Sequence, residues 1–195
     1  MSQLQSCRSR QGFSLVELML ALSLGLALSG VMLQGLMAEG QNGLRFSRLM
    51  HARAVQRRTL DLIQRDLAQA SMASIDPSGE SAACGLSGRT AVLHLKTAAG
   101  LITYSMGAAP SRIWRGAVLM RCGPSYGLDG WLQGGTAPVQ RVVLDALVPG
   151  EKGVAIEHES ISGVATISLH QAFINPTRRT HQISTSRIVP GTIFQ

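Results

Sequence analysis

The sequence is short of charged and of aromatic side chains. Of its 195 residues, 15% are charged and 4% are aromatic, whereas 45% are hydrophobic. This composition excludes disorder over the whole length and favours a membrane segment. Lysine is nearly absent, because Lys96 and Lys152 are the only lysines among the 18 basic residues. The net charge of +7 permits an anionic partner, such as nucleic acid or phospholipid, without identifying one.

The chain also lacks the residue patterns on which catalysis and metal binding depend. Its three cysteines form no Cys-x-x-Cys pair and its five histidines have no metal-ligand spacing. These absences argue against a zinc ribbon, a thioredoxin-like site and an iron–sulfur centre. There is no phosphate-binding glycine loop with lysine, no nucleophile elbow and no clear catalytic dyad. We therefore expect no enzyme activity, no metal and no cofactor.

One long apolar run lies near the N-terminus. Residues 13–33 contain a single charged side chain, Glu17, and are otherwise interrupted only by Ser and Gly. As a helix, 21 residues rise about 31 Å, which matches the hydrocarbon core of a bilayer. The run is too long for an ordinary secretory signal, whose apolar part has about 7 to 15 residues. The sequence therefore predicts a membrane-spanning helix.

A polar leader precedes this run and ends in a distinctive way. Arg8 and Arg10 come first, then Gly12 and Phe13, and Glu17 follows four residues after the phenylalanine. This pattern closely resembles the processing site of type IV prepilins, the family that includes type IV pilins and type II secretion pseudopilins. The resemblance implies cleavage after Gly12 by a prepilin peptidase and N-methylation of Phe13.

The same resemblance implies a location and a set of partners. The chain would sit in the inner membrane with an exported C-terminal domain and then enter a pilus or pseudopilus, at the cell surface or in the periplasm. Its partners would be the prepilin peptidase, other major and minor pilins, the inner-membrane assembly platform and, before assembly, membrane lipid. DNA is a possible further partner for which the sequence gives little support.

The charges around the apolar run predict the opposite topology. Arg8 and Arg10 precede the run, whereas five arginines follow it between residues 45 and 58. The positive-inside rule would therefore leave the C-terminal part in the cytoplasm. We follow the prepilin pattern, because its elements agree in both spacing and residue type, whereas charge asymmetry is a bias with known exceptions.

The cysteines favour export. Cys7 would leave with the leader, so that Cys84 and Cys122 would remain as an even pair in the mature chain. Disulfides persist outside the cytoplasm. We expect these two cysteines to form a disulfide, with two isolated buried thiols as the alternative.

A second helical pattern follows the apolar run. Leu60, Ile63 and Leu67 recur at i, i+3 and i+7, with polar residues that include Asp61 and Asp66 between them. This spacing predicts an amphipathic helix with one buried stripe. We expect four parts in the chain. They are a leader at 1–12, a transmembrane or filament-core helix at 13–38, an amphipathic stalk helix at 39–75, and an exported β-rich domain at 76–195.

The period of the apolar residues changes to two after residue 81. Alternating runs at 91–96 and 101–106, joined by Ala-Ala-Gly, predict a hairpin. Further strands are expected at 112–121, 139–145, 154–159, 164–171 and 182–189. The resulting fold class is α+β, in which a long N-terminal helix packs on an antiparallel sheet, as in type IV pilins.

Short motifs refine the resemblance. Tyr104-Ser105-Met106, then Arg112-Ile113-Trp114-Arg115, and the final segment 182–187 are similar to larger minor pilins and J-type pseudopilins. The chain departs from a typical major pilin because its apolar helix has no proline and its mature cysteines lie far from the C-terminus. We expect a structural subunit that primes or joins assembly of a type IV pilus or related filament, serving adhesion, motility, DNA uptake or secretion. The alternative is a membrane-anchored binding module that never polymerises, such as a DNA receptor.

Two groups of charged residues are candidates for function. An acid in a membrane segment is costly and usually has a partner, so Glu17 is expected to neutralise the Phe13 amine of a neighbouring subunit. The arginines of the second helix are expected at scattered helical angles, which favours a solvated or inter-subunit surface. Arg53, Arg57 and Arg58 are the candidates for contact with an anion such as DNA.

Overall fold

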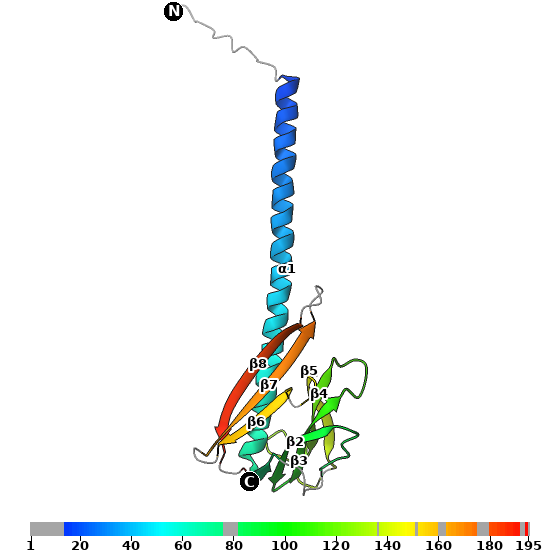
Figure 1. Cartoon of the computed structure of the whole chain (residues 1–195), viewed down its shortest axis with the longest axis vertical. Helices are drawn as coiled ribbons and strands as arrows, with labels where there is room; N and C mark the ends of the chain where they lie inside the picture. The colour runs from blue at the N-terminus through cyan, green and yellow to red at the C-terminus, as the bar shows by residue number, and fades with distance from the viewer. Residues whose placement is uncertain are drawn as a thin grey trace, which may run out of the picture. The chain divides into compact units, whose positions relative to one another are not determined.

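The computed structural model describes residues 14–75, 82–135, 137–150, 152–159, 163–174, 180–191 and 194, apart from the side chains of residues 38, 41, 42, 45, 174 and 181. The chain divides into two compact units, residues 1–48 and residues 49–195. The elements in order are α1 (Leu15–Ala68), β1 (Ala70–Ser74), β2 (Thr90–Thr97), β3 (Gly100–Ala108), β4 (Ala117–Gly123), β5 (Val139–Leu147), β6 (Val154–Glu159), β7 (Val164–Ile174) and β8 (Thr180–Pro190). Figure 1 labels α1 and the strands from β2 to β8.

Helix α1 contains 54 residues and no proline. It ends at Ala68, whereas the sequence pattern predicted helix as far as residue 75. That prediction is wrong because residues 70–74 form β1, which pairs with β2 and buries Ala73 completely. Sheet pairing and burial of Ala73 override the local helical preference of this segment.

The strands form one antiparallel sheet in the order β1-β2-β3-β4-β5-β7-β6, with β8 paired to β7. The predicted hairpin is confirmed as β2 and β3, which pair from Thr97 with Gly100 to Thr90 with Met106. The fold class, an N-terminal helix with an antiparallel sheet, is also confirmed. β5 and β7 are joined at one pair alone, Leu147 with Gln171, so the strands gather as β1–β5 and β6–β8 (Figure 1).

The strand predicted at 112–121 begins later than the sequence indicated. β4 starts at Ala117, and residues 111–116 form bends and a turn instead. Gly116 has a φ of 61°, and the amide of Arg115 donates to the Asp145 carboxylate. The alternating pattern before Ala117 therefore belongs to a turn, because the left-handed backbone at Gly116 interrupts an extended strand.

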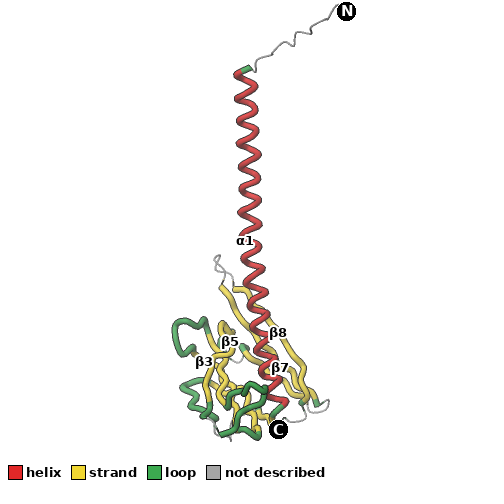
Figure 2. The backbone as a smooth tube through the Cα atoms, turned by 180° about the vertical axis from the view of Figure 1, so that it is seen from behind, coloured by secondary structure: helices red, strands yellow, loops and turns green. Residues whose placement is uncertain are grey.

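The core lies between the sheet and the part of α1 after Leu49, which lie against each other in Figure 2. The predicted helical stripe is confirmed, because Leu60, Ile63 and Leu67 are at most 6% exposed and belong to the core cluster. The strand expected at 164–171 is present as β7, in which Ala165, Ile167 and Leu169 are at most 1% exposed. Both patterns follow from the one-sided burial of a helix and a strand on a shared core.

Candidate functional site

The helical segment Leu15–Met37 is apolar and exposed. Its mean hydropathy is 2.0 and none of it is buried inside the chain, and it is the one described helix long and apolar enough to cross a bilayer. Its serine hydroxyls bond within the helix, from Ser23 to the Leu20 carbonyl and from Ser29 to the Gly25 carbonyl. Such internal bonds reduce the cost of placing a hydroxyl in an apolar environment.

Glu17 lies in the first turn of this helix and its side chain is exposed. The helix begins after Ser14, whose carbonyl accepts hydrogen bonds from the amides of Glu17 and Leu18 at 3.0 and 3.1 Å. A carboxylate in the first turn interacts favourably with the positive end of the helix dipole. Gly12 and Phe13, the residues expected at the processing site, lie outside the described residues.

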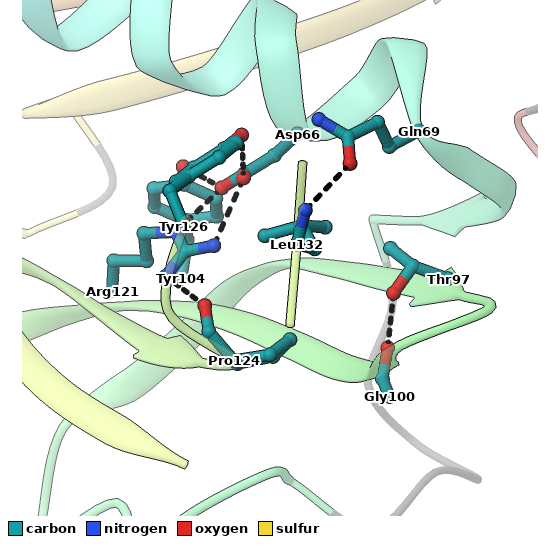
Figure 3. Close-up of polar contacts among 9 residues, drawn as sticks. All are labelled: Asp66, Gln69, Thr97, Gly100, Tyr104, Arg121, Pro124, Tyr126 and Leu132. Carbon is teal, nitrogen blue, oxygen red and sulfur yellow. Dashed lines mark hydrogen bonds and ion pairs between the residues drawn. The ribbon is translucent and has the colours of Figure 1, made fainter. Parts of the chain in front are cut away.

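The C-terminal end of α1 is held to the sheet by a buried charged cluster at Asp66, drawn in Figure 3. The Arg121 guanidinium of β4 donates from Nε to Asp66 Oδ2 at 2.6 Å and from Nη2 to Oδ1 at 2.9 Å. Tyr104 of β3 and Tyr126 donate their hydroxyls to Oδ2 and Oδ1 at 2.5 and 2.6 Å. Arg121 also donates from Nη1 to the Pro124 carbonyl at 3.0 Å. The carboxylate therefore receives four hydrogen bonds.

Burial makes this cluster electrostatically strong. Asp66 is 0% exposed and the Arg121 side chain 9%. Burial, the Asp66 charge and the Asp66 hydrogen bond, in that order, raise the pKa of Tyr104 well above 10.0. Burial and the Asp66 hydrogen bond likewise raise the pKa of Tyr126. Burial lowers the pKa of Arg121, but its bonds to Asp66 and the Asp66 charge raise it more. Both tyrosines therefore remain neutral hydrogen-bond donors.

The sequence pattern did not predict this cluster. It placed Asp66 among the polar residues between the buried positions, whereas the structure buries Asp66 completely. A signal was present, because Asp66 lies three residues after Ile63 and seven after Thr59, which are both buried. Nothing in the order of residues indicated that Arg121 would face it from β4.

Further polar contacts attach α1 to two strands that do not pair with each other. Gln56 donates to the Ile183 carbonyl of β8 at 3.0 Å and accepts from the Thr185 hydroxyl at 2.5 Å. The Thr59 hydroxyl donates to the Val143 carbonyl of β5 at 3.0 Å. The helix thus donates hydrogen bonds to backbone carbonyls of β5 and β8, two strands that each pair with β7.

The two cysteines expected to form a disulfide are joined on the face of the sheet that points away from α1. Cys84 and Cys122 form a disulfide with a Cα–Cα distance of 6.1 Å. Cys122 follows Arg121 directly, and consecutive strand residues point to opposite faces. Two more contacts hold the same segment, from the Ala83 amide to the Thr103 hydroxyl and from Gln140 to the Gly85 carbonyl. The disulfide therefore fixes a covering segment on the face away from α1.

The arginines of α1 after Leu49 lie on one side of the helix. Arg53, Arg57, Arg58 and Arg65 are all exposed. At about 100° per residue they span about 140° of the helix surface, opposite the buried stripe. The expectation of scattered helical angles concerned all the arginines from residue 45 to residue 65, of which these four share one side. Among the described residues, none of the four makes an ion pair.

The described residues contain no group of three or more His, Cys, Asp or Glu side chains that could hold a metal ion. His94 is buried beside the Thr103 hydroxyl at 3.2 Å, and His158 stacks on Phe194 with ring centroids 5.4 Å apart. These two histidines contribute to packing within the sheet domain.

The comparison with protein families identifies the N-terminal segment. Residues 7–33 match the model described as the prokaryotic N-terminal methylation motif, which is the signal of type IV prepilins and pseudopilins. The resemblance predicted from the leader and the apolar run is confirmed, and the motif marks structural pilin-type proteins, not an enzyme family. The comparisons with curated proteins and with solved structures found no match.

Proposed function

We propose that this chain is a minor pilin or pseudopilin, a structural subunit that primes or joins the assembly of a type IV pilus or a related filament. The proposal rests mainly on one observation, which is that the matched motif and the exposed apolar helix cover the same residues. The methylation motif at residues 7–33 coincides with the exposed apolar helix Leu15–Met37, which has no partner within the described chain. In the mature subunit this helix would lie first in the inner membrane and then against the helices of its neighbours.

Processing and assembly assign roles to three residues. A prepilin peptidase would cleave after Gly12, and Phe13 would become the methylated N-terminus. The new amine would carry a positive charge about one helical turn from Glu17. In a filament core, the Glu17 carboxylate of an incoming subunit would pair with the Phe13 amine of its neighbour, because an unpaired buried charge is strongly destabilising.

The second unit has features suited to an exported head domain. Its disulfide joins Cys84 to Cys122, and disulfides are characteristic of oxidising compartments. The Asp66 cluster ties the end of α1 to β3 and β4. Assembly through α1 would therefore carry this sheet domain along with the helix.

Shearing of cells tests the proposal. The full chain, produced in cells that make the filament, should appear with the sheared filaments as the mature form that begins at Phe13. In otherwise identical cells lacking the prepilin peptidase, the chain should stay in the membrane at its full length. A chain that remains with the membrane in both strains would contradict a role as a filament subunit.

The rival function is a membrane-anchored module that binds DNA and never polymerises. The exposed Arg53, Arg57 and Arg58 are the observation in its favour. Phosphate contacts make DNA affinity fall steeply with salt. We expect weak binding or none when duplex DNA is titrated into the detergent-solubilised chain. Submicromolar, salt-sensitive binding that is lost on changing the three arginines to Gln would favour the rival.

A further inference from the structure

The arginine face, defined as Arg53, Arg57, Arg58 and Arg65, carries charge that the rest of the described chain does not balance. The acid among these arginines is Asp61, which forms an ion pair with Arg187 of β8. Arg187 also donates to Gln64 at 2.9 Å. Since Asp61 is already neutralised from the sheet, the arginine face presents four positive charges on about four turns of helix.

This arrangement is unfavourable in an isolated chain. Arg53 and Arg57 are four residues apart, and like charges at this spacing repel each other on a helix surface. The opposite side of the same helical segment is fully occupied by the core and by Asp66. Among the described residues the four arginines have no acidic ion-pair partner, so an anionic surface outside the described chain would be their counterpart.

The residues among the arginines favour a protein over a nucleic acid as this counterpart. Met50 and Ala54 lie on the same exposed side, and Met50 is 50% exposed. Small and apolar side chains allow a second helix to approach closely, whereas a phosphate backbone offers no apolar surface. This side of the helix after Leu49 also carries no Phe, Tyr or Trp on which a base could stack.

A second copy of this chain is a poor counterpart. Its own helix would present the same arginines, and the chain has 18 basic residues against 11 acidic ones. The exposed acids described in the second unit lie on separate elements, with Asp129 in a loop and Glu157 and Glu159 on β6. No described surface of the chain therefore gathers enough carboxylates to match four arginines.

We propose that the arginine face docks an acidic helix of a different filament subunit, with carboxylates against the four guanidinium groups and with Met50 and Ala54 in the contact at its N-terminal end. Arginine suits this role because its planar guanidinium pairs with a carboxylate through two hydrogen bonds. The inference rests on the proposed function, because it takes the neighbour from the same filament. The neighbour of this chain in the filament would then be a different, acidic subunit and not a second copy of this chain.

Photo-crosslinking at the N-terminal end of the arginine face tests this inference. The full chain carries the photoreactive residue p-benzoyl-phenylalanine in place of Ala54 and is produced in filament-forming cells. We expect illumination to yield an adduct with another prepilin-type subunit whose crosslinked helix is acidic. Removing three charges by Arg53→Gln, Arg57→Gln and Arg58→Gln should reduce the adduct at least about tenfold, since truncating one side of a close charge pair costs that much or more.

A matched control removes the same amount of charge elsewhere. Arg112→Gln, Arg115→Gln and Arg141→Gln alter exposed arginines of the sheet domain and should leave the adduct unchanged. Changing the three helix arginines to Glu should abolish the adduct. Changing the crosslinked carboxylates of the partner to Arg in the same cells should restore it, which a general loss of folding would not allow.

The remaining outcomes overturn the inference. An adduct of two copies of this chain, a nuclease-sensitive adduct with DNA, or an adduct equally strong in the Gln variant would each contradict an acidic subunit. The sheared fraction is measured in parallel to separate the two proposals. A chain present in filaments without a charge-dependent adduct overturns the docking alone, whereas a chain absent from filaments overturns the proposed function as well.

Discussion

Asp66 of α1 and Arg121 of β4 are 55 residues apart in the sequence and meet through two hydrogen bonds in the interior. The carboxylate is fully buried, and Tyr104 and Tyr126 occupy its remaining acceptor positions. A buried pair of this kind strongly penalises the loss of either partner, because the other charge stays in a medium of low polarity. The charged cluster at the C-terminal end of α1 therefore centres on a single carboxylate.

Asp66→Asn should destabilise the chain by about 3 to 5 kcal/mol, because it leaves the Arg121 guanidinium buried without a counter-charge. The measurement is urea unfolding of the full chain in detergent. Asp61→Asn is the matched control, since it makes the same change on the same helix and also breaks one ion pair with arginine. That pair is partly exposed, so the control should cost no more than about 1 kcal/mol. Equal losses from the two variants would contradict the role given to burial.

The two tyrosines of the cluster predict a loss of stability in alkali. Their pKa values in the folded chain are raised, so the unfolded chain releases these protons first as the pH increases. Stability is therefore fully present below pH 10.0, the ordinary tyrosine value, and falls as the pH rises above it. The chain contains two tyrosines in all, so tyrosinate absorbance reports on this cluster alone. If the tyrosine hydroxyls of the folded chain lost their protons with a midpoint at the ordinary tyrosine pKa, the prediction would be contradicted.

Breaking the disulfide should lower stability without removing the sheet. Cys84 and Cys122 enclose a sequence separation of 38 residues, for which the chain-entropy relation gives about 4 kcal/mol. The double variant Cys84→Ser and Cys122→Ser should therefore unfold at lower urea. In the unaltered chain, both thiols should resist alkylation until reductant is added. Free alkylation of exported chain without reductant would show that the bond is absent in the cell.

Gly12→Val should block processing, because a branched side chain would replace the smallest one at the expected scissile bond. Intact-mass measurement of the chain co-expressed with a prepilin peptidase gives the result directly. The unaltered chain should lose residues 1–12, and the variant should keep them. Gly25→Val, within the exposed apolar helix and with no neighbour near its Cβ position, serves as a control that should still be cleaved.

Glu17→Leu should separate membrane insertion from assembly. It removes the one charge of the apolar run, so insertion becomes easier by about 3 kcal/mol and cleavage continues. Assembly should decrease by more than about a hundredfold, because the Phe13 amine of a neighbouring subunit would be buried unpaired. The measured quantity is the ratio of this chain in sheared filaments to that in membranes. An unchanged ratio would show that Glu17 acts only as a tolerated acid at the helix N-terminus.

The sequence alone determined the features that depend on local patterns. The leader with Gly12, Phe13 and Glu17 identified the prepilin signal, because a peptidase recognises a contiguous stretch of chain. The spacing of Leu60, Ile63 and Leu67 predicted the buried stripe of α1, and alternation predicted β2, β3 and β7. These patterns are readable because a helix and a strand bury one side each, with periods that the chain itself carries.

Only the tertiary structure decided which distant residues meet. Asp66 had the appearance of a surface acid until Arg121, Tyr104 and Tyr126 were brought to it from the sheet. The end of α1 at Ala68 depended on the pairing of β1 with β2. Which side of α1 stays exposed, and so leaves the arginine face uncovered, was likewise decided by the packing of the sheet on the opposite side. In each case the deciding energy comes from burial and pairing between segments far apart in the chain, which local propensity does not contain.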